Sequence, residues 1–311
     1  MTGHLQADEL LMIIAIASYS LGALALIWYF FSREAWLRNL GAPLAIAGCL
    51  AQFAQLSVRF AITGVWPLLN LYGSLSLFAA MSVAIFIGFA LRYKIWFAGG
   101  FVLGLAAIFL AYGVTWNEGT MPPVPSLQSY WAKVHVPIVV SSYAAFLVAF
   151  VFSAIYLVKY YAEQRIATAY GSAELAGTGM TMRVSGDAPA LQAAAANGSA
   201  VAGWLQTLPS LGQLDVLVYR AVAIGLPLIS LGIITGAAWA KEAWGAYWQW
   251  DPKETAALAT WILYLAYMHL HTRNAWRGLR TNWISVIGFL LVIFTYLGVN
   301  IWISGLHSYK V

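Results

Sequence analysis

The chain has 311 residues, of which 62% are hydrophobic and 9% are charged, and its mean hydropathy is +0.76. A soluble domain of this length would carry about 25% charged residues, so the composition excludes an ordinary globular protein and predicts an integral membrane protein. The net charge of +5 is modest, and no block of lysines and arginines indicates a nucleic-acid partner. The single cysteine, Cys49, excludes an internal disulfide or a CxxC pair, so thiol chemistry would need a partner.

Eight apolar segments have about the 20-residue length that crosses a bilayer as a helix. They cover residues 10–31, 41–62, 72–92, 95–114, 134–158, 214–239, 253–270 and 282–303. The predicted fold class is therefore all-α, a bundle of about eight transmembrane helices in a single polytopic domain. Asp8 and Glu9 precede the first segment and no basic stretch does, so we expect a retained helix rather than a cleaved signal peptide.

Lysines and arginines are divided unevenly between alternate loops, and such a bias sets the orientation of a membrane protein. With the N-terminus outside, ten of them lie in inner loops and five lie in outer segments or near an outer helix end. Both termini and the loop over residues 240–254 are then expected outside. The inner segment 168–203 is rich in Ala, Gly, Ser and Thr, and we expect a flexible cytoplasmic loop because it has little apolar surface to bury.

Residues 244–254, between the sixth and seventh segments, read WGAYWQWDPKE. The end of this stretch is typical of a helix start, with Asp251 as N-cap, Pro252 at the first position and Glu254 at the third. These two acids therefore have a structural role, and we do not expect them to act as acid or base in catalysis.

The beginning of the same stretch is unusually aromatic. Its four aromatic residues fall within seven positions: Trp244, Tyr247, Trp248 and Trp250. An interfacial belt needs only about one or two aromatics per helix end. If the piece is helical, Trp244 and Trp248 share a face that suits a planar ligand. The helix start behind it, with Lys241 and Lys253, suits anionic groups, so the stretch predicts a site for a flat, anionic, iron-bearing ligand such as haem.

The chain has five histidines: His4, His135, His269, His271 and His307. Either His135 or His307 alone is explained as an interfacial residue. Together, at the predicted outer face on different helices flanking the aromatic stretch, they could supply two axial ligands to a haem iron. His269 and His271 are near the inner end of the seventh helix and point about 200° apart, so one faces the bundle and the other faces away. Spacing alone does not choose between them. His4 is expected to be solvated.

Charged residues inside predicted helices need a partner or a route to the interface. Arg220, in the inner half of the sixth segment, would pair with Asp215, snorkel to the interface or meet a haem propionate, and we favour the first two. Arg59, near an outer helix end, and Lys253 are candidates for propionate contacts at the outer site.

WGAYWQWDPKE resembles the tryptophan-rich WWD signature, WGxxWxWDxKE, of haem-handling proteins in cytochrome c biogenesis. The stretches LQSYWAKVHV at His135, TWILYLAYMH ending at His269 and GLHSY at His307 are similar to the CcsA (ResC) family, a subunit of the System II cytochrome c synthase. The resemblance covers roughly residues 70–310, so residues 1–70 are expected to be N-terminal helices and residues 71–311 the family core.

The resemblance implies a subunit that works with a CcsB (ResB) membrane partner to export haem b and attach it to the CxxCH cysteines of apocytochrome c. It implies that His135 and His307 ligate haem at the external WWD site and that His269 ligates haem in transit, with the second transit ligand on the partner. A thioredoxin-like reductant would supply reduced thiols. The expected location is a bacterial inner membrane or a thylakoid membrane, with the active site on the outer face.

Three other functions compete with this interpretation. A System I relative that loads haem onto a chaperone would have fewer or many more helices than eight. A bis-haem electron-transfer protein would need two histidine pairs on facing helices. A small-molecule transporter would leave the dense tryptophan stretch unexplained.

Overall fold

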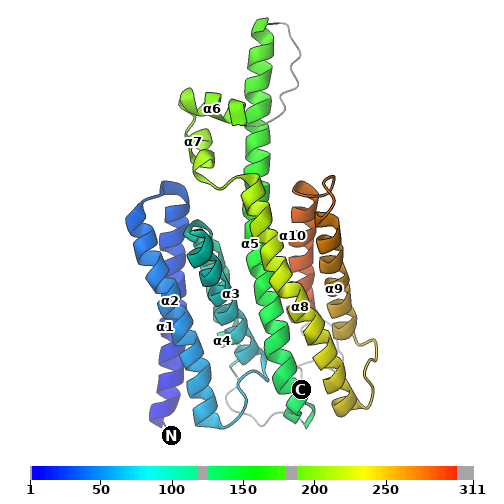
Figure 1. Cartoon of the computed structure of the whole chain (residues 1–311). Helices are drawn as coiled ribbons and strands as arrows, with labels where there is room; N and C mark the ends of the chain where they lie inside the picture. The colour runs from blue at the N-terminus through cyan, green and yellow to red at the C-terminus, as the bar shows by residue number, and fades with distance from the viewer. Residues whose placement is uncertain (1, 118–124, 179–187, 300–311) are drawn as a thin grey trace.

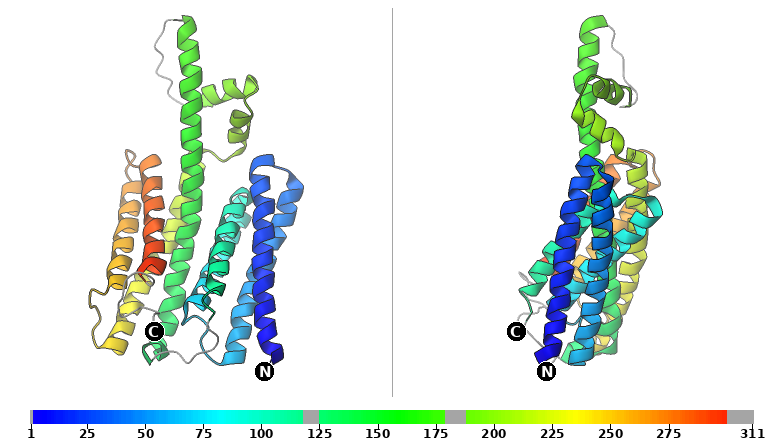
Figure 2. Two further views of the ribbon diagram at one scale, coloured as in Figure 1. Left: turned by 180° about the vertical axis from the view of Figure 1, so that it is seen from behind. Right: turned by 90° about the vertical axis from the view of Figure 1, so that its left-hand side faces the viewer.

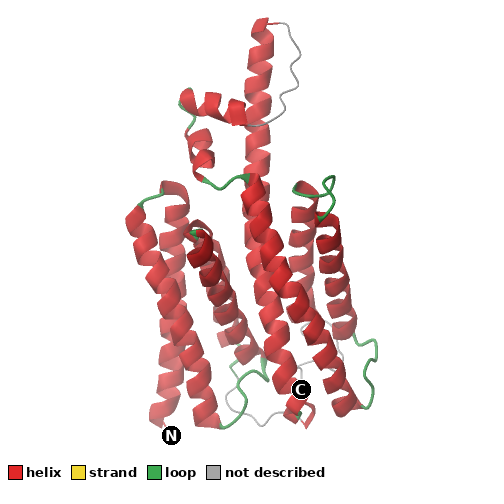
Figure 3. Cartoon of the chain, viewed as in Figure 1, coloured by secondary structure: helices red, strands yellow, loops and turns green. Residues whose placement is uncertain are grey.

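The computed structural model describes residues 2–117, 125–178 and 188–299, and every regular element in these ranges is helical (Figure 3). The elements are α1 (Thr2–Ser32), α2 (Ala35–Thr63), α3 (Leu71–Tyr93), η1 (Trp96–Ala98), α4 (Gly99–Val114), η2 (Pro125–Gln128), α5 (Tyr130–Thr178), α6 (Ala188–Ala196), α7 (Ala200–Thr207), α8 (Leu211–Trp244), α9 (Pro252–His271), α10 (Leu279–Ile293) and the π-helical turn η3 (Phe294–Gly298). The prediction of an all-α fold is confirmed.

Seven helical stretches among the described residues are long and apolar enough to cross a membrane. They are Ala7–Ser32, Ala35–Thr63, Leu71–Tyr93, Trp96–Val114, Tyr130–Ala169, Leu211–Trp244 and Leu279–Gly298. The eighth predicted segment corresponds to α9, which is 20 residues long but has Lys253 and Glu254 in its first turn and two histidines in its last turn. These polar ends shorten the apolar part of α9, so length and composition support seven spans where eight were predicted.

The long helices run side by side, with α5 and α8 between the N-terminal helices α1–α4 and the pair α9 and α10 (Figures 1 and 2). Helix α5 packs against α8, α3 and α10, and therefore forms the centre of the bundle. Helix α1 begins at the end of the bundle where the loop from α8 to α9 lies (Figure 1). We call this the tryptophan end and the other the opposite end; which of them faces outward stays a prediction.

Glycines on α8 allow α5 and α8 to approach closely. A Cβ atom at Gly225 would lie 2.5 Å from the Phe146 ring, and one at Gly232 would lie 3.2 Å from a methyl carbon of Val139. Small residues at helix interfaces permit such close packing in membranes, where dispersion contacts replace the hydrophobic effect as the driving force. The close approach brings the first turns of α5 next to the last turns of α8, at the tryptophan end.

Residues 168–203, expected to form a flexible loop, are mostly helical where the structure describes them, with a short non-helical turn at residues 197–199. Helix α5 continues to Thr178, α6 follows, and α7 starts at Ala200. Many alanines explain the difference, because alanine has the highest helix propensity even where there is little to bury. Helix α7 is also docked: the indole N–H of Trp204 donates to the carbonyl oxygen of Phe30 at 2.8 Å.

Candidate functional site

We call residues 244–251, between α8 and α9, the tryptophan loop, and it starts where α8 ends. Gly245 has φ +84°, the left-handed conformation that glycine adopts readily at a helix end, and its N–H bonds to the Lys241 carbonyl at 3.1 Å. The Lys241 ammonium in turn donates to the Gly245 carbonyl at 2.8 Å. The helix therefore does not continue to Trp248, and the condition under which Trp244 and Trp248 would share a helical face is not met.

The aromatic residues of the loop form two pairs instead. Trp244 packs on Trp239, with ring centroids 5.1 Å apart, and Trp248 meets Trp250 edge to face at 5.6 Å. Trp250 is 69% exposed and Tyr247 is 63% exposed, so both offer their rings to the surface. The indole nitrogen of Trp248 is buried and has no acceptor among the described residues. The loop thus combines exposed aromatic surface with one buried indole N–H that has no acceptor among the described residues.

The start of α9 closes the loop as predicted. The Asp251 side chain accepts from the backbone N–H of Lys253 at 3.1 Å, and Glu254 accepts from the backbone N–H groups of Gln249 at 2.8 Å and Asp251 at 3.3 Å. This is a capping box with proline at its start. The helix-capping role of Asp251 and Glu254 is confirmed.

His135 lies on the second turn of α5, against α8. Its Nδ1 atom is 2.8 Å from the carbonyl oxygen of Gly232. Because a carbonyl oxygen can only accept, this bond puts the proton on Nδ1, and the neutral ring then has Nε2 as its basic nitrogen. Metal-binding histidines are commonly oriented in this way by a backbone carbonyl.

The surroundings of His135 are aromatic and tight. Its ring lies 5.7 Å from that of Trp239, the tryptophan that also contacts Trp244. A Cβ atom at Gly236 would lie 2.8 Å from Cε1 of His135. Any residue larger than glycine at this position would therefore displace the imidazole ring. His135 is half-buried. Because the Trp239 ring contacts both His135 and Trp244, it connects this histidine to the tryptophan loop.

The other predicted ligands are placed differently. His307 lies outside the described residues. His269 is exposed on α9, near the exposed Ile262 and Leu265, whereas His271 is 8% exposed and points into the bundle. The predicted divergence of His269 and His271 is confirmed, so within the described residues they do not form the facing pairs that a bis-haem electron carrier needs.

His271 belongs to a polar cluster at the opposite end that joins α8, α9 and α10. Asp215 accepts hydrogen bonds from His271 Nε2 at 2.9 Å, Arg277 Nε at 3.2 Å and Asn282 Nδ2 at 3.1 Å. The Tyr219 ring stacks on the imidazole at 4.7 Å. Sequence reasoning missed this cluster and considered Asp215 as a partner of Arg220.

The three cations suggested for haem propionates occupy different environments. Arg59 is buried and ion-paired, with Nη1 2.8 Å from Asp8 and Nη2 3.1 Å from the Asn117 side-chain oxygen. Arg220 lies at the opposite end with its guanidinium 4.7 Å from the centre of the Tyr93 ring. Lys253 lies in the first turn of α9 at the tryptophan loop. Contact of any of them with a propionate stays a prediction.

Trp239 and Gly236 are functional candidates that sequence reasoning did not select. Trp239 forms a small buried cluster with Leu69 and Ala132, against which Trp244 packs, and its indole donates to the Ser126 carbonyl at 2.8 Å. The signal in the sequence is the GxxxG pattern made by Gly232 and Gly236, which indicates a close helix neighbour. The identity of that neighbour comes only from the packing.

These features define a polytopic helical membrane protein with an oriented histidine beside a tryptophan-rich loop. A family model described as Cytochrome C assembly protein matches residues 68–307. Proteins named cytochrome c biogenesis protein CcsA are similar along most of the chain. The one from Synechococcus elongatus is 37% identical over 286 residues, covering 86% of each chain, and the one from Gloeobacter violaceus is 34% identical over 323 residues, covering 96% of this chain and 92% of its own.

The chain belongs to the CcsA family of cytochrome c biogenesis proteins. A CcsA protein of the alga Heterosigma akashiwo is 35% identical over 277 residues, covering 87% of this chain and 85% of its own. Among solved structures, cytochrome c heme lyase CcmF superposes with a TM-score of 0.61 at 16% identity. The match covers 94% of this chain and 46% of CcmF, so the two share a helical fold over about half of the larger protein.

Proposed function

We propose that this chain is the haem-holding subunit of a cytochrome c synthase. It takes haem b as a substrate in transit, with His135 and His307 as axial ligands at the tryptophan end, and presents it to the CxxCH cysteines of apocytochrome c. A CcsB-type membrane protein is its partner. The observation that supports this best is the 2.8 Å bond from His135 Nδ1 to the Gly232 carbonyl beside Trp239, because it orients the ring for iron through Nε2.

The tryptophan loop supplies what a haem needs besides axial ligands. Trp250 and Tyr247 present exposed rings, and planar aromatic ligands stack well on such rings. The buried indole N–H of Trp248 can donate to an anionic group, and a bound ligand would satisfy it. Asp251 and Glu254 are occupied in capping α9, so this chain holds and orients its substrate rather than acting through these acids.

The chemistry proposed at this site is addition of two thiols to the two vinyl groups of haem. In each addition a bond forms between sulfur and a vinyl carbon, the thiol hydrogen goes to the other vinyl carbon, and the double bond becomes single. No oxidant is consumed. The role of this chain is to hold the vinyl groups beside the thiols, which accelerates the reaction by orientation. The substrate histidine of CxxCH then displaces one protein ligand and the product leaves.

A separate thioredoxin-like protein keeps the substrate thiols reduced. Cys49 is buried in the bundle and its thiol lies 3.7 Å from the Ala80 carbonyl, so it is placed for packing and not for thiol exchange.

The exposed position of His269 supports a transit site shared with the partner. His269 lies on a face of α9 where Ile262 and Leu265 are also exposed. A haem bound there would need its second ligand from outside this chain, which a CcsB-type subunit would provide.

The external ligands are tested by absorption spectra of the protein purified with its partner. We expect His135→Ala and His307→Ala each to lose or shift the Soret and visible bands of haem at the tryptophan end, whereas His4→Ala leaves them unchanged. Unchanged bound haem in both variants would contradict the ligand assignment.

The synthase activity is tested by co-expression with an apocytochrome and a thiol reductant. We expect haem bound covalently to CxxCH, detected as a haem-stained band that survives denaturation. If no covalent product forms with an active partner and reductant, the chain is not a synthase subunit.

The transit ligand is tested by comparing His269→Ala with His271→Ala. We expect only His269→Ala to lose haem from the membrane site, while His271→Ala lowers stability because it leaves Asp215 with one partner fewer. The opposite pattern would assign the transit site to His271.

A further inference from the structure

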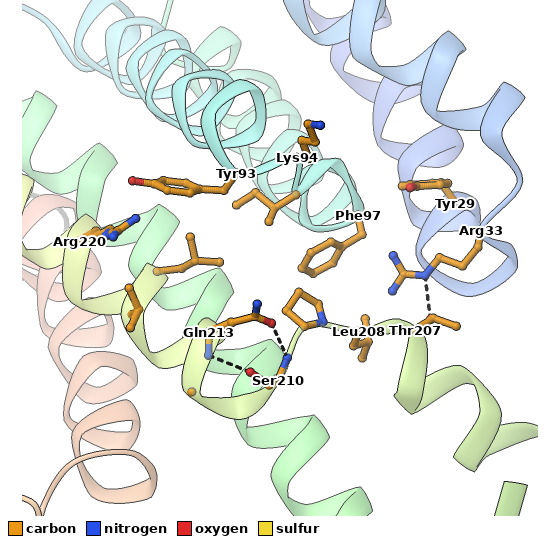
Figure 4. A pocket seen from close by; sticks show the side chains of 15 residues that line it. Tyr29, Arg33, Tyr93, Lys94, Phe97, Thr207, Leu208, Ser210, Gln213 and Arg220 are labelled. Atoms are coloured by element: carbon orange, nitrogen blue, oxygen red, sulfur yellow. Dashed lines mark hydrogen bonds between the residues drawn. The ribbon is translucent and has the colours of Figure 1, made fainter. Parts of the chain in front are cut away.

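Figure 4 shows a cavity of about 750 Å³. The helix ends that line it lie at the opposite end of the bundle (Figure 1). The ends of α1 and α3 form one part of its wall, and the end of α7 with the start of α8 forms the other. Three cations line it, Arg33, Lys94 and Arg220, and none of the described residues in its wall is acidic. Such an excess of positive charge in one cavity suits an anion.

The backbone at two of these cations is unusual. Arg33 has φ +60° and Lys94 has φ +58°, both in the left-handed region at a helix end where glycine or asparagine is the ordinary residue. Only one other non-glycine among the described residues, Trp250 of the tryptophan loop, has a positive φ. Side chains retained at strained positions are candidates for a functional role.

Arg33 is held in place yet retains an unused donor. Its Nε donates to the hydroxyl of Thr207 at 3.0 Å, and its guanidinium lies 5.2 Å from the centre of the Phe97 ring. Its Nη2 atom is buried and finds no acceptor among the described residues. Desolvation by burial also lowers the pKa of this guanidinium from its usual value. An anion in the cavity would relieve both penalties.

Two of the cations in the cavity wall lie where long apolar helices end. Arg33 directly follows the apolar stretch Ala7–Ser32, and Lys94 directly follows Leu71–Tyr93. The walls combine these cations with apolar side chains such as Leu208, Val216 and Leu217. A ligand with a charged head and an apolar body fits such walls better than a fully hydrated anion does.

We propose that this cavity binds the phosphate headgroup of an anionic phospholipid, attracted by the positive charge of Arg33, Lys94 and Arg220 in its wall. Basic pockets between membrane helices recognise phospholipid heads in this way. Because the three cations come from the ends of α1 and α3 and from α8, a bound lipid headgroup lies between these three helices. This site is independent of haem and lies at the other end of the molecule from His135.

The test is native mass spectrometry of the full-length protein after incubation with micelles that contain equal amounts of dioleoyl phosphatidylglycerol and dioleoyl phosphatidylcholine. We expect the wild type to retain the anionic lipid in preference to the zwitterionic one. We expect Lys94→Gln with Arg220→Gln to retain about tenfold less phosphatidylglycerol, since each cation near a headgroup contributes to the affinity. Both side chains are exposed, so the variant is expected to fold, which its helical circular dichroism and elution volume check.

The matched control is Arg38→Gln with Arg273→Gln. It removes two exposed charges from the same end, but neither residue lines the cavity. We expect it to retain phosphatidylglycerol like the wild type. Equal retention of both lipids, or an equal loss in the two double variants, would overturn the proposal.

Two displacement measurements show whether the bound anionic group belongs to a lipid, to free phosphate or to haem. If millimolar inorganic phosphate displaces phosphatidylglycerol, the site binds free phosphate and the lipid proposal fails. If ferric protoporphyrin displaces it, and this binding weakens in the Lys94 and Arg220 variant, the ligand is a haem carboxylate and the lipid proposal again fails. The haem spectrum at His135 is expected to be unchanged in that variant, so this test is separate from that of the synthase function.

Discussion

His135 and His271 lie at opposite ends of one bundle and have opposite kinds of partner. His135 is half-buried and donates to a neutral carbonyl, that of Gly232. His271 is buried against the carboxylate of Asp215, which also accepts from Arg277 and Asn282. The neutral carbonyl fixes the orientation and tautomer of the His135 imidazole, whereas the shared carboxylate makes the His271 ring one member of a network that joins three helices. The partner of each histidine, and not its burial alone, therefore distinguishes the two positions.

The largest loss of stability is expected when the buried hydrogen-bond network around Asp215 is broken. Asp215→Ala leaves His271, Arg277 and Asn282 without their common acceptor, and we expect a loss of about 3 kcal/mol in the free energy of unfolding. Thermal unfolding in detergent measures it. Asp215→Asn retains one acceptor oxygen and should lose less. If Asp215→Ala is as stable as the wild type, the cluster does not hold the opposite end together and the contrast with His135 disappears.

A smaller, local effect is expected at the glycine beneath His135. Gly236→Val places a branched side chain where a Cβ alone would be 2.8 Å from the ring, so the ring must move away from Gly232. We expect haem at the tryptophan end to bind about tenfold more weakly, while overpacking destabilises the fold by roughly 1–3 kcal/mol.

Gly88→Val is the control for this change, because a Cβ at Gly88 meets nothing within 4 Å. It should retain the haem spectrum of the wild type. A normal spectrum in Gly236→Val would show that the position of the His135 ring is not what binds haem.

The smallest effect is expected from one hydrogen-bond donor. Trp248→Phe removes the buried indole N–H that has no acceptor among the described residues, so we expect stability to be unchanged or slightly raised. Haem affinity should fall by about fivefold, the equivalent of one net hydrogen bond. Titration with haem measures the affinities of Trp248→Phe and of Trp250→Phe, which changes an exposed tryptophan for comparison. Equal affinities for wild type and Trp248→Phe would mean that this donor does not face the ligand.

Features that depend on neighbouring residues were predictable from the sequence. The capping of α9 by Asp251 and Glu254 is local, and so is the divergence of His269 and His271 along one helix. The long helices follow from apolar length. The segment 168–203 was expected to be a loop because its composition was weighed only for burial, whereas most of its described residues are helical, which its alanines favour on their own.

The sequence by itself determined that this chain is a helical membrane protein, where α9 starts, and which aromatic loop lies beside that start. Only the tertiary structure decided that Gly232 orients His135, that Asp215 binds His271 and not Arg220, and that Arg33, Lys94 and Arg220 line one cavity. The physical reason is the distance along the chain between the residues that interact. Helix length and capping depend on residues within a turn or two, whereas these partners are brought together only by the packing of separate helices, which small residues at the contact permit.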